Sequence, residues 1–216
     1  MTDTRLRGFG PVGILAFLVI FAGNLLVVPL SAVLVLLWVQ QSGTPWHEIG
    51  FVRPKNWLTT IVVGVALGIA LKFLMKAVVM PLLGADPINQ AYHYLVGNSA
   101  AIPGMLYSIL VGAAFGEETL FRGFLFERLG KLLGPGVRKK VLIVLLSAAL
   151  FGAAHLPEQG IPGMQQGIVV GLVFGAIYAS AGRLFMLMIA HAAFDLTALA
   201  MIYWNLEADV AHLIFR

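Results

Sequence analysis

Long uncharged apolar runs constrain this chain more than any other feature of its sequence. The first, from Val12 to Gln40, contains no Asp, Glu, Lys or Arg, and a helix needs about 20 apolar residues to cross the hydrocarbon core of a bilayer. Across the chain 60% of the residues are hydrophobic and 11% are charged, against about 25% charged residues in soluble domains. A soluble domain of 216 residues has too little interior to hide so many apolar side chains. We therefore expect an all-α, polytopic bundle of transmembrane helices.

About six apolar segments are expected to cross the membrane. The first is interrupted by Asn24 and Pro29, so it is either one long, kinked helix or a bent pair of helices. Two units are expected along the chain: residues 1–56 hold the first span and a connecting loop, and residues 57–216 form a membrane-embedded core. The expected spans are Val12–Gln40, Trp57–Leu83, Met105–Leu129, Val141–His155, Ile168–Ser180 and Leu184–Trp204.

The basic residues of the short loops predict the orientation, because such loops stay in the cytoplasm. The loop between the third and fourth spans is the most basic, and alternation then places the loops with Asp86 and Glu158 outside. The amino terminus conflicts with a six-span count, which puts Arg5 and Arg7 outside, although a bent first span would remove this conflict. The residues expected inside are Arg53, Lys55, Arg128, Lys131, Arg138, Lys139, Lys140 and Arg183.

Composition also excludes several chemistries. The chain contains no cysteine, which removes disulfides, thiol nucleophiles and thiolate metal sites. The net charge of +4 comes from basic residues in short loops and not from a basic patch with interleaved aromatic residues, so no nucleic-acid partner is expected. The expected partners are membrane lipids and a substrate that is itself held at the membrane.

Ionisable side chains inside the spans are the strongest sign of a functional site. A charge at the centre of a spanning helix costs about 2.5–3.5 kcal/mol on insertion scales. At 1.5 Å per residue from the cytoplasmic end, Glu117 lies roughly 16 Å deep, His155 roughly 22 Å, His191 roughly 12 Å and Asp195 roughly 18 Å. Spans three, four and six therefore bring polar groups to the middle third of the bilayer, which predicts a site between them.

Helical spacing suggests how the residues of the third span are used. Glu118 and Arg122 are four residues apart and can form an ion pair within one helix, which is either support or part of the chemistry. Glu117 points about 100° away and has no basic neighbour on its own face. A buried carboxylate without a cation suits a general base or acid near neutral pH.

The same spacing recurs in the other spans. His191 and Asp195 share a helix face, as do Phe151 and His155. Lys72 and Lys76 interrupt the second span, where snorkelling or packing into a polar groove is commoner than a functional lysine pair.

Three short segments together resemble the motifs of a known family. Gly116–Gly123 has two adjacent glutamates with an arginine four residues after the second, Phe151–His155 has a histidine four residues after phenylalanine, and His191–Asp195 has an aspartate four residues after histidine. In this order, within an all-helical membrane chain, they resemble the CAAX-protease and bacteriocin-processing family. Ile49–Pro54 is similar to an element that precedes the core of bacterial members. We therefore expect a multi-pass integral protein of the bacterial cytoplasmic membrane.

The resemblance implies an intramembrane endopeptidase that hydrolyses a peptide bond of a membrane-associated substrate. Glu117 would activate water with the help of His155, while His191 and Asp195 would stabilise the oxyanion or hold the other side of the cavity. The supporting residues would be Glu118, Arg122 and Phe151.

The third motif departs from the family pattern at its last position. Many members have asparagine where this chain has Asp195. An ionised aspartate cannot donate a hydrogen bond to an oxyanion, so Asp195 either stays protonated or orients His191.

A zinc-dependent mechanism is the alternative, because the family is often labelled as metalloproteases. The nitrogen and oxygen ligands would come from Glu117, His155, His191 and Asp195, although the chain has no His-Glu-x-x-His motif. The mechanism that we favour needs no cofactor.

Two other classes of function compete with the protease. The chain could be a non-catalytic membrane scaffold or bacteriocin-immunity protein, in which the polar cluster only fixes helix packing. A small transporter is a weaker alternative, because the inverted repeats typical of transporters are missing from the sequence.

Overall fold

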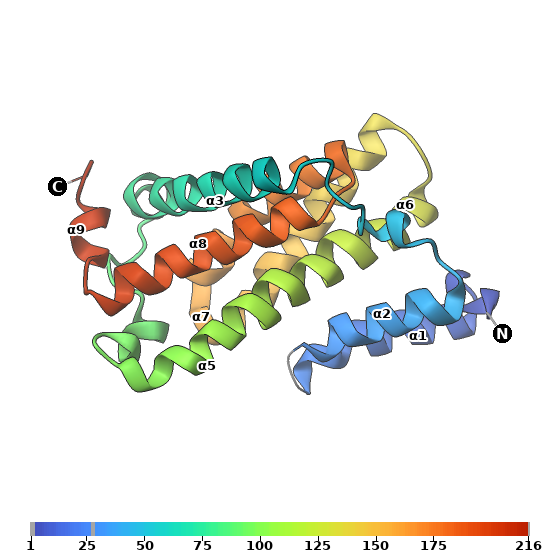
Figure 1. Cartoon of the computed structure of the whole chain (residues 1–216), viewed down its shortest axis with the longest axis horizontal. Coiled ribbons are helices and arrows are strands. Elements are labelled where there is room, and N and C mark those ends of the chain that lie inside the picture. Colours follow the sequence, from blue (N-terminus) through green and yellow to red (C-terminus); the bar gives the residue numbers. More distant parts are fainter. Residues whose placement is uncertain (1–2, 27–28, 216) are drawn as a thin grey trace.

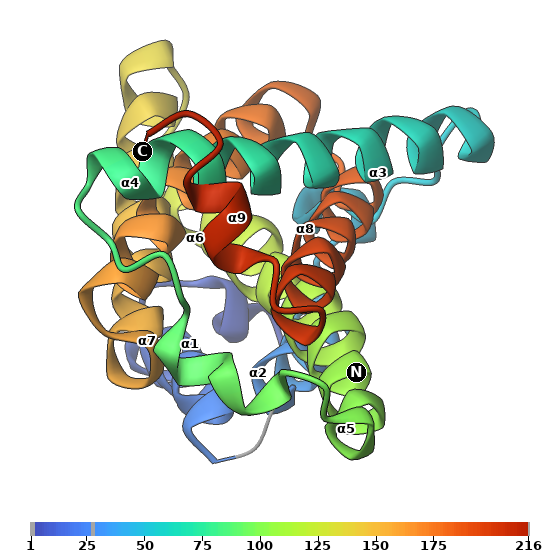
Figure 2. The same cartoon turned by 90° about the vertical axis from the view of Figure 1, so that its left-hand side faces the viewer.

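The computed structural model describes residues 3–26 and 29–215. Every regular element in this part of the chain is a helix, which confirms the all-α prediction. In Figure 1, α8 (Phe185–Tyr203) and the segment that begins with α5 (Ile102–Tyr107) run roughly along the long axis of the molecule. α3 (Trp57–Leu74) lies on the side of α8 away from α1 (Pro11–Ala22) and α2 (Leu30–Ser42), and it is seen from the side in Figure 2. By length and composition, four segments of these described residues are long and apolar enough to cross a membrane: Trp57–Leu82, Ser99–Leu133, Val137–Ala181 and Phe185–Tyr203. The protein is therefore an integral membrane protein.

The first predicted span is a bent pair of helices. α1 (Pro11–Ala22) continues into the short 3₁₀-helix η2 (Gly23–Leu25), and α2 (Leu30–Ser42) returns beside α1 (Figure 1). At the turn the Asn24 N–H donates to Ser31 Oγ and the Ser31 N–H donates to Asn24 Oδ1, both at 2.9 Å. The two helices have 12 and 13 residues, or roughly 18 and 20 Å, which is shorter than the hydrocarbon core of about 30 Å.

The hairpin of α1 and α2 begins and ends at the same end of the molecule. The Asp3 N–H donates to the Gln41 carbonyl at 2.7 Å, so the amino terminus lies beside the end of α2. At the opposite end of the hairpin, a Cβ added to Gly116 would lie 3.2 Å from Cβ of Pro29. The turn of the hairpin therefore packs beside Glu117, one of the candidate site residues.

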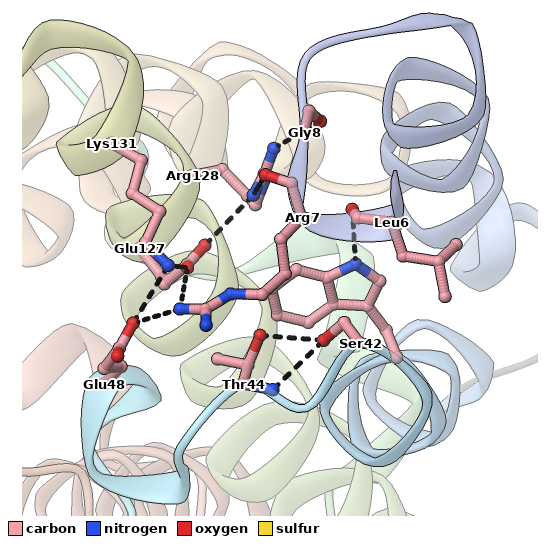
Figure 3. A network of polar contacts seen from close by, with 10 residues as sticks. Leu6, Arg7, Gly8, Ser42, Thr44, Glu48, Glu127, Arg128 and Lys131 are labelled. Carbon is pink, nitrogen blue, oxygen red and sulfur yellow. Dashed lines mark hydrogen bonds and ion pairs between the residues drawn. The ribbon is translucent and has the colours of Figure 1, made fainter. Parts of the chain in front are cut away.

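A polar network holds the amino terminus in place. The Arg128 guanidinium donates to the Arg7 carbonyl at 2.8 Å, and Arg7 Nη2 lies 2.6 Å from Glu48 Oε2 (Figure 3). Glu127 Oε1 lies 2.6 Å from Lys131 Nζ, which also lies 3.0 Å from Glu48 Oε2. These contacts tie η1 (Thr4–Arg7), η3 (Trp46–Ile49) and α6 (Leu125–Leu133) together at the end of the molecule that carries the most basic loop.

The ionisation of Glu48 reflects this network. Burial raises the pKa of its carboxyl, but the hydrogen bond from Lys131 and the charges of Lys131 and Arg7 outweigh burial and lower the pKa below its ordinary value. Glu48 is thus held as a carboxylate between two cations. The basic residues of the amino terminus and of the loop after α6 consequently share one end of the molecule.

One long helical segment carries two glycines where it packs against another. α3 (Trp57–Leu74) continues through the π-helix η4 (Met75–Val79) into α4 (Met80–Leu82), and α8 (Phe185–Tyr203) lies beside α3 (Figure 2). A Cβ added to Gly64 would lie 2.8 Å from Cγ2 of Ile189, and one added to Gly68 would lie 2.8 Å from Cβ of Ala193. The matching order of these contacts shows that α3 and α8 run parallel.

The fourth and fifth predicted spans are the two arms of one element, α7 (Val137–Ala181). The chain reverses at Gly160, whose φ of 64° and ψ of −161° break the helix between Pro157 and Pro162. A Cβ added to Gly167 would lie 2.9 Å from Cα of Gly152, so the arms pack antiparallel with backbones in close approach. Small residues at such positions are typical of helix packing in membranes.

Shorter elements complete the chain. The 3₁₀-helices η5 (Gln90–Leu95) and η6 (Ser99–Ala101) lead into α5 (Ile102–Tyr107), which continues through the π-helix η7 (Ser108–Phe124) into α6, and α9 (Glu207–Ala211) follows α8. In α9, Glu207 Oε1 lies 2.6 Å from Lys76 Nζ. The predicted division of the chain at residue 56 stays a prediction.

Candidate active site

The first motif lies on an unusual helix. η7 has π-helical geometry, and at its end the Leu125 N–H donates to the carbonyl of Leu120, five residues earlier. π-helical turns are rare and occur frequently at functional sites. The helix buries Glu118 and Arg122 completely, whereas Glu117 keeps 25% of its side chain exposed.

Glu118 and Arg122 form the ion pair that their spacing predicts. Arg122 Nη1 donates to Glu118 Oε1 at 2.9 Å. The guanidinium carbon also lies 4.3 Å from the ring centroid of Phe151 and 5.6 Å from that of Phe174, a geometry that favours cation–π attraction. The pair is thus enclosed by aromatic rings from both arms of α7.

His191 brings α8 onto this ion pair. Its Nδ1 lies 2.7 Å from Glu118 Oε1, and a carboxylate that is paired with arginine can only accept hydrogen bonds. Nδ1 therefore carries the proton and donates it. The other ring nitrogen, Nε2, lies 3.5 Å from Asp195 Oδ2 and 3.8 Å from Glu117 Oε2.

The two carboxylates around Nε2 form the more open side of the cluster. His191 is 5% exposed, while the Glu117 and Asp195 side chains are 25% and 27% exposed. Separations of 3.5 and 3.8 Å are longer than a direct N–H···O hydrogen bond of about 2.7–3.2 Å. A single water or substrate oxygen placed among these three groups could contact all of them.

His155 lies at the edge of the cluster. Its Nδ1 donates to the carbonyl of Phe151 at 2.8 Å, which leaves Nε2 free for other contacts. The Phe151 ring separates the two histidines, with its centroid 4.7 Å from His155 and 6.1 Å from His191. Within residues 3–26 and 29–215 no hydrogen bond or ion pair joins His155 to Glu117. The structure therefore brings Glu117, His191 and Asp195 into one cluster, with His155 beside it.

The contact between Glu118 and His191 is the main feature that sequence reasoning missed. Spacing within one helix reveals the Glu118–Arg122 pair, but a contact between η7 and α8 depends on how the two helices are rotated. Glu118 thus links the first motif to the third, in addition to its predicted support of Arg122. Among the described residues, Glu118 Oε2, Glu117 Oε2 and Arg122 Nη2 are buried atoms without a hydrogen-bond partner.

Two cavities lie away from this cluster. One of about 240 Å³ is lined by residues including Lys76 and His212, and one of about 600 Å³ is lined by residues including Lys131 and Tyr178. Neither cavity has Glu117, His155, His191 or Asp195 in its lining.

The zinc-dependent alternative needs a set of metal ligands among the candidate residues. In the described part of the chain, no three or more His, Cys, Asp or Glu side chains are arranged to hold a metal ion. Zinc bound by nitrogen and oxygen ligands needs donor atoms about 2.0–2.2 Å from the ion in tetrahedral directions. We derive no catalytic step through a metal.

The fold and the cluster define a class of protein: a helical membrane protein with a buried glutamate, histidine and arginine network between its helices. Residues 99–197 match a family model described as type II CAAX prenyl endopeptidase Rce1-like. The match spans all three motifs and confirms the family that they suggested for this region. At the level of the family, it indicates a CAAX-type intramembrane protease. No curated protein and no solved structure matches the chain.

Proposed function

We propose that the protein hydrolyses a peptide bond of a membrane-associated substrate and that Glu117 activates the attacking water. The supporting observation is that the Glu117 side chain is 25% exposed and places its Oε2, a buried atom with no hydrogen-bond partner among the described residues, 3.8 Å from His191 Nε2. The Glu118–Arg122 pair fixes the opposite side of the same imidazole. A general base needs such access to water together with positioned partners.

The first chemical step belongs to Glu117. Its carboxylate takes a proton from water while the water oxygen forms a bond to the carbonyl carbon of the peptide. Negative charge then develops on the carbonyl oxygen, and hydrogen-bond donors placed for that charge lower the barrier. The bond from Nδ1 to Phe151 leaves Nε2 of His155 unused at the edge of the cluster, and we assign it an assisting role.

His191 is the candidate donor to the developing oxyanion. Because its Nδ1 proton is committed to Glu118, Nε2 can donate only when the ring is an imidazolium. Asp195 Oδ2, 3.5 Å from Nε2, is placed to balance the charge of that imidazolium. An ionised Asp195 then serves by orienting His191 and need not donate itself. The step ends when the carbon–nitrogen bond breaks and the amine takes the proton from Glu117.

The family description suggests the kind of substrate to test. A CAAX sequence is a carboxyl-terminal motif whose cysteine carries a prenyl lipid. We propose a lipidated peptide that approaches from the membrane and place the protein in the bacterial cytoplasmic membrane, with lipids as its surroundings.

Cleavage of a fluorogenic prenylated peptide by purified protein tests the proposal. Glu117→Gln keeps the size of the side chain but removes the base, so kcat should fall by about 10²–10⁴-fold. Asp209→Asn, which changes an exposed carboxylate of α9, should leave kcat unchanged. Equal turnover by the native protein and Glu117→Gln would show that the cluster fixes helix packing and does not act as a base.

A further inference from the structure

Lys72 is a buried cation without a carboxylate partner in the described ranges. It lies in α3 with 7% of the residue exposed. Its Nζ lies 3.2 Å from Gln166 Oε1 and 4.8 Å from the ring centroid of Phe194. One turn further along the chain, Lys76 has the partner that Lys72 lacks, with Glu207 Oε1 at 2.6 Å. A buried charge that is left uncompensated is costly. A bound anion would compensate the charge of the Lys72 ammonium.

The hydrogen-bonding capacity of the Lys72–Gln166 pair points to the same ligand. An ammonium has three donor hydrogens and no acceptor, and the bond to Gln166 uses one of them. That bond also occupies the amide oxygen, and Gln166 Nε2 has no acceptor among residues 3–26 and 29–215. The remaining polar groups of the pair are therefore mostly donors, which complement the two oxygens of a carboxylate.

The pair lies between helices of the candidate active site. Gln166 precedes Gly167 on the second arm of α7, where an added Cβ would lie 3.3 Å from His155 Nδ1. On the other side, Phe194, whose ring lies next to Lys72 Nζ, immediately precedes Asp195 on α8. A ligand held by Lys72 would consequently lie beside the residues that we assign to catalysis.

We propose that Lys72 and Gln166 form a subsite that binds a carboxylate of the substrate next to the bond that is cleaved. This inference rests on the proposed function. A substrate whose scissile bond lies close to its carboxyl terminus brings one carboxylate to a fixed distance from that bond. The subsite would select such peptides over internal sequences, because an internal peptide has no charge to place at Lys72.

Two prenylated peptides that differ only at the carboxyl terminus test the subsite. One ends in a free carboxylate and the other in an amide, and both Kd and kcat/KM are measured in detergent. Charged hydrogen bonds of this kind correspond to about a 10- to 100-fold preference of the native protein for the acid. Lys72→Met should weaken the binding and cleavage of the peptide acid alone, so that the preference for the acid over the amide falls to near unity.

Gln166→Glu provides a variant that keeps the fold if Lys72→Met does not. The new carboxylate would take the place of the amide that already contacts Lys72 Nζ, filling the subsite from within and abolishing the preference for the acid. Gln165→Glu adds the same charge at the adjacent half-buried position and should leave the preference intact.

The outcomes separate this inference from the proposed function. Cleavage of both peptides at equal rates by the native protein would overturn the subsite and leave the protease standing. If the protein binds the acid in preference to the amide but cleaves neither peptide, the subsite is supported and the proposed protease activity is overturned. Equal losses on both peptides in Lys72→Met would show that Lys72 positions Asp195 and would also overturn the subsite.

Discussion

Glu118 connects the two helices that carry the candidate site. One oxygen, Oε1, lies 2.9 Å from Arg122 Nη1 and 2.7 Å from His191 Nδ1. The arginine pairs with Glu118 in an apolar surrounding, and the same carboxylate oxygen fixes the tautomer and the rotation of the imidazole. A residue that the sequence suggests only as support thus determines which atom of His191 faces Glu117.

Removal of Arg122 should impair folding more than removal of Glu117. Arg122→Ala leaves the fully buried Glu118 carboxylate without its cation, which costs about 3–5 kcal/mol. Glu117→Ala removes a partly exposed carboxylate that has no ion pair with lysine or arginine among the described residues. The yield of monodisperse protein and its thermal stability in detergent measure the difference, and equal values for the two variants would contradict the role of Arg122.

Metal removal should leave activity intact. In the proposed mechanism the base is Glu117 and not a water bound to zinc, so exhaustive chelation should change kcat little, and elemental analysis should find no stoichiometric metal. A zinc-dependent protease would lose its activated water on chelation, since the ion supplies that nucleophile. Loss of activity that zinc alone restores would replace the proposed mechanism while keeping the peptidase activity.

At the scale of elements, the turn inside α7 determines where His155 lies. Gly160 adopts a positive φ of 64°, which glycine tolerates far better than other residues. The reversal brings the second arm back along the first, so that Gly167 packs on Gly152 near the ring of His155. The glycines of both arms are therefore part of what positions the second motif.

A side chain added at Gly152 should separate the two arms. Its Cβ would contact Ile168 and lie 2.7 Å from the Met164 carbonyl oxygen, so Gly152→Ala should destabilise the protein by about 1–3 kcal/mol through overpacking. Gly130→Ala in α6 adds the same atom where nothing lies within 4 Å. That control should be neutral or slightly stabilising, because alanine is the better helix former. A thermal midpoint of Gly152→Ala at or above that of the control would contradict this packing.

Some elements could be predicted from the sequence and others could not. Glycine and two prolines in the sequence indicate the reversal in α7, and a spacing of four residues indicates the Glu118–Arg122 pair. Both signals are local, so they can be found in the sequence alone. The π-helical geometry of η7 has no such signal, because it differs from an α-helix only in which carbonyl each N–H reaches. The approach of His191 to Glu118 depends on packing between helices that are far apart in the chain.

At the scale of the whole molecule, the hairpin of α1 and α2 removes the conflict in the predicted orientation. Apolar residues continue through its turn, so hydropathy alone does not distinguish one kinked helix from two helices. The contacts of Asn24 with Ser31 and of Asp3 with Gln41 show the return of the chain. Because of the hairpin, the basic amino terminus lies at the same end of the molecule as the other basic loops. This arrangement agrees with the rule that basic loops stay in the cytoplasm.

Single-cysteine reporters test this topology directly, because the natural chain contains no cysteine. Thr4→Cys and Lys139→Cys place exposed thiols at the basic end, and Asp86→Cys places one in the loop after α4. In intact cells, a maleimide that cannot cross the membrane should label only Asp86→Cys, while all three variants should react after the cells are opened. A span that crossed once between residues 12 and 40 would move Thr4 to the outer side. Labelling of Thr4→Cys in intact cells, with Lys139→Cys still protected, would therefore overturn the hairpin.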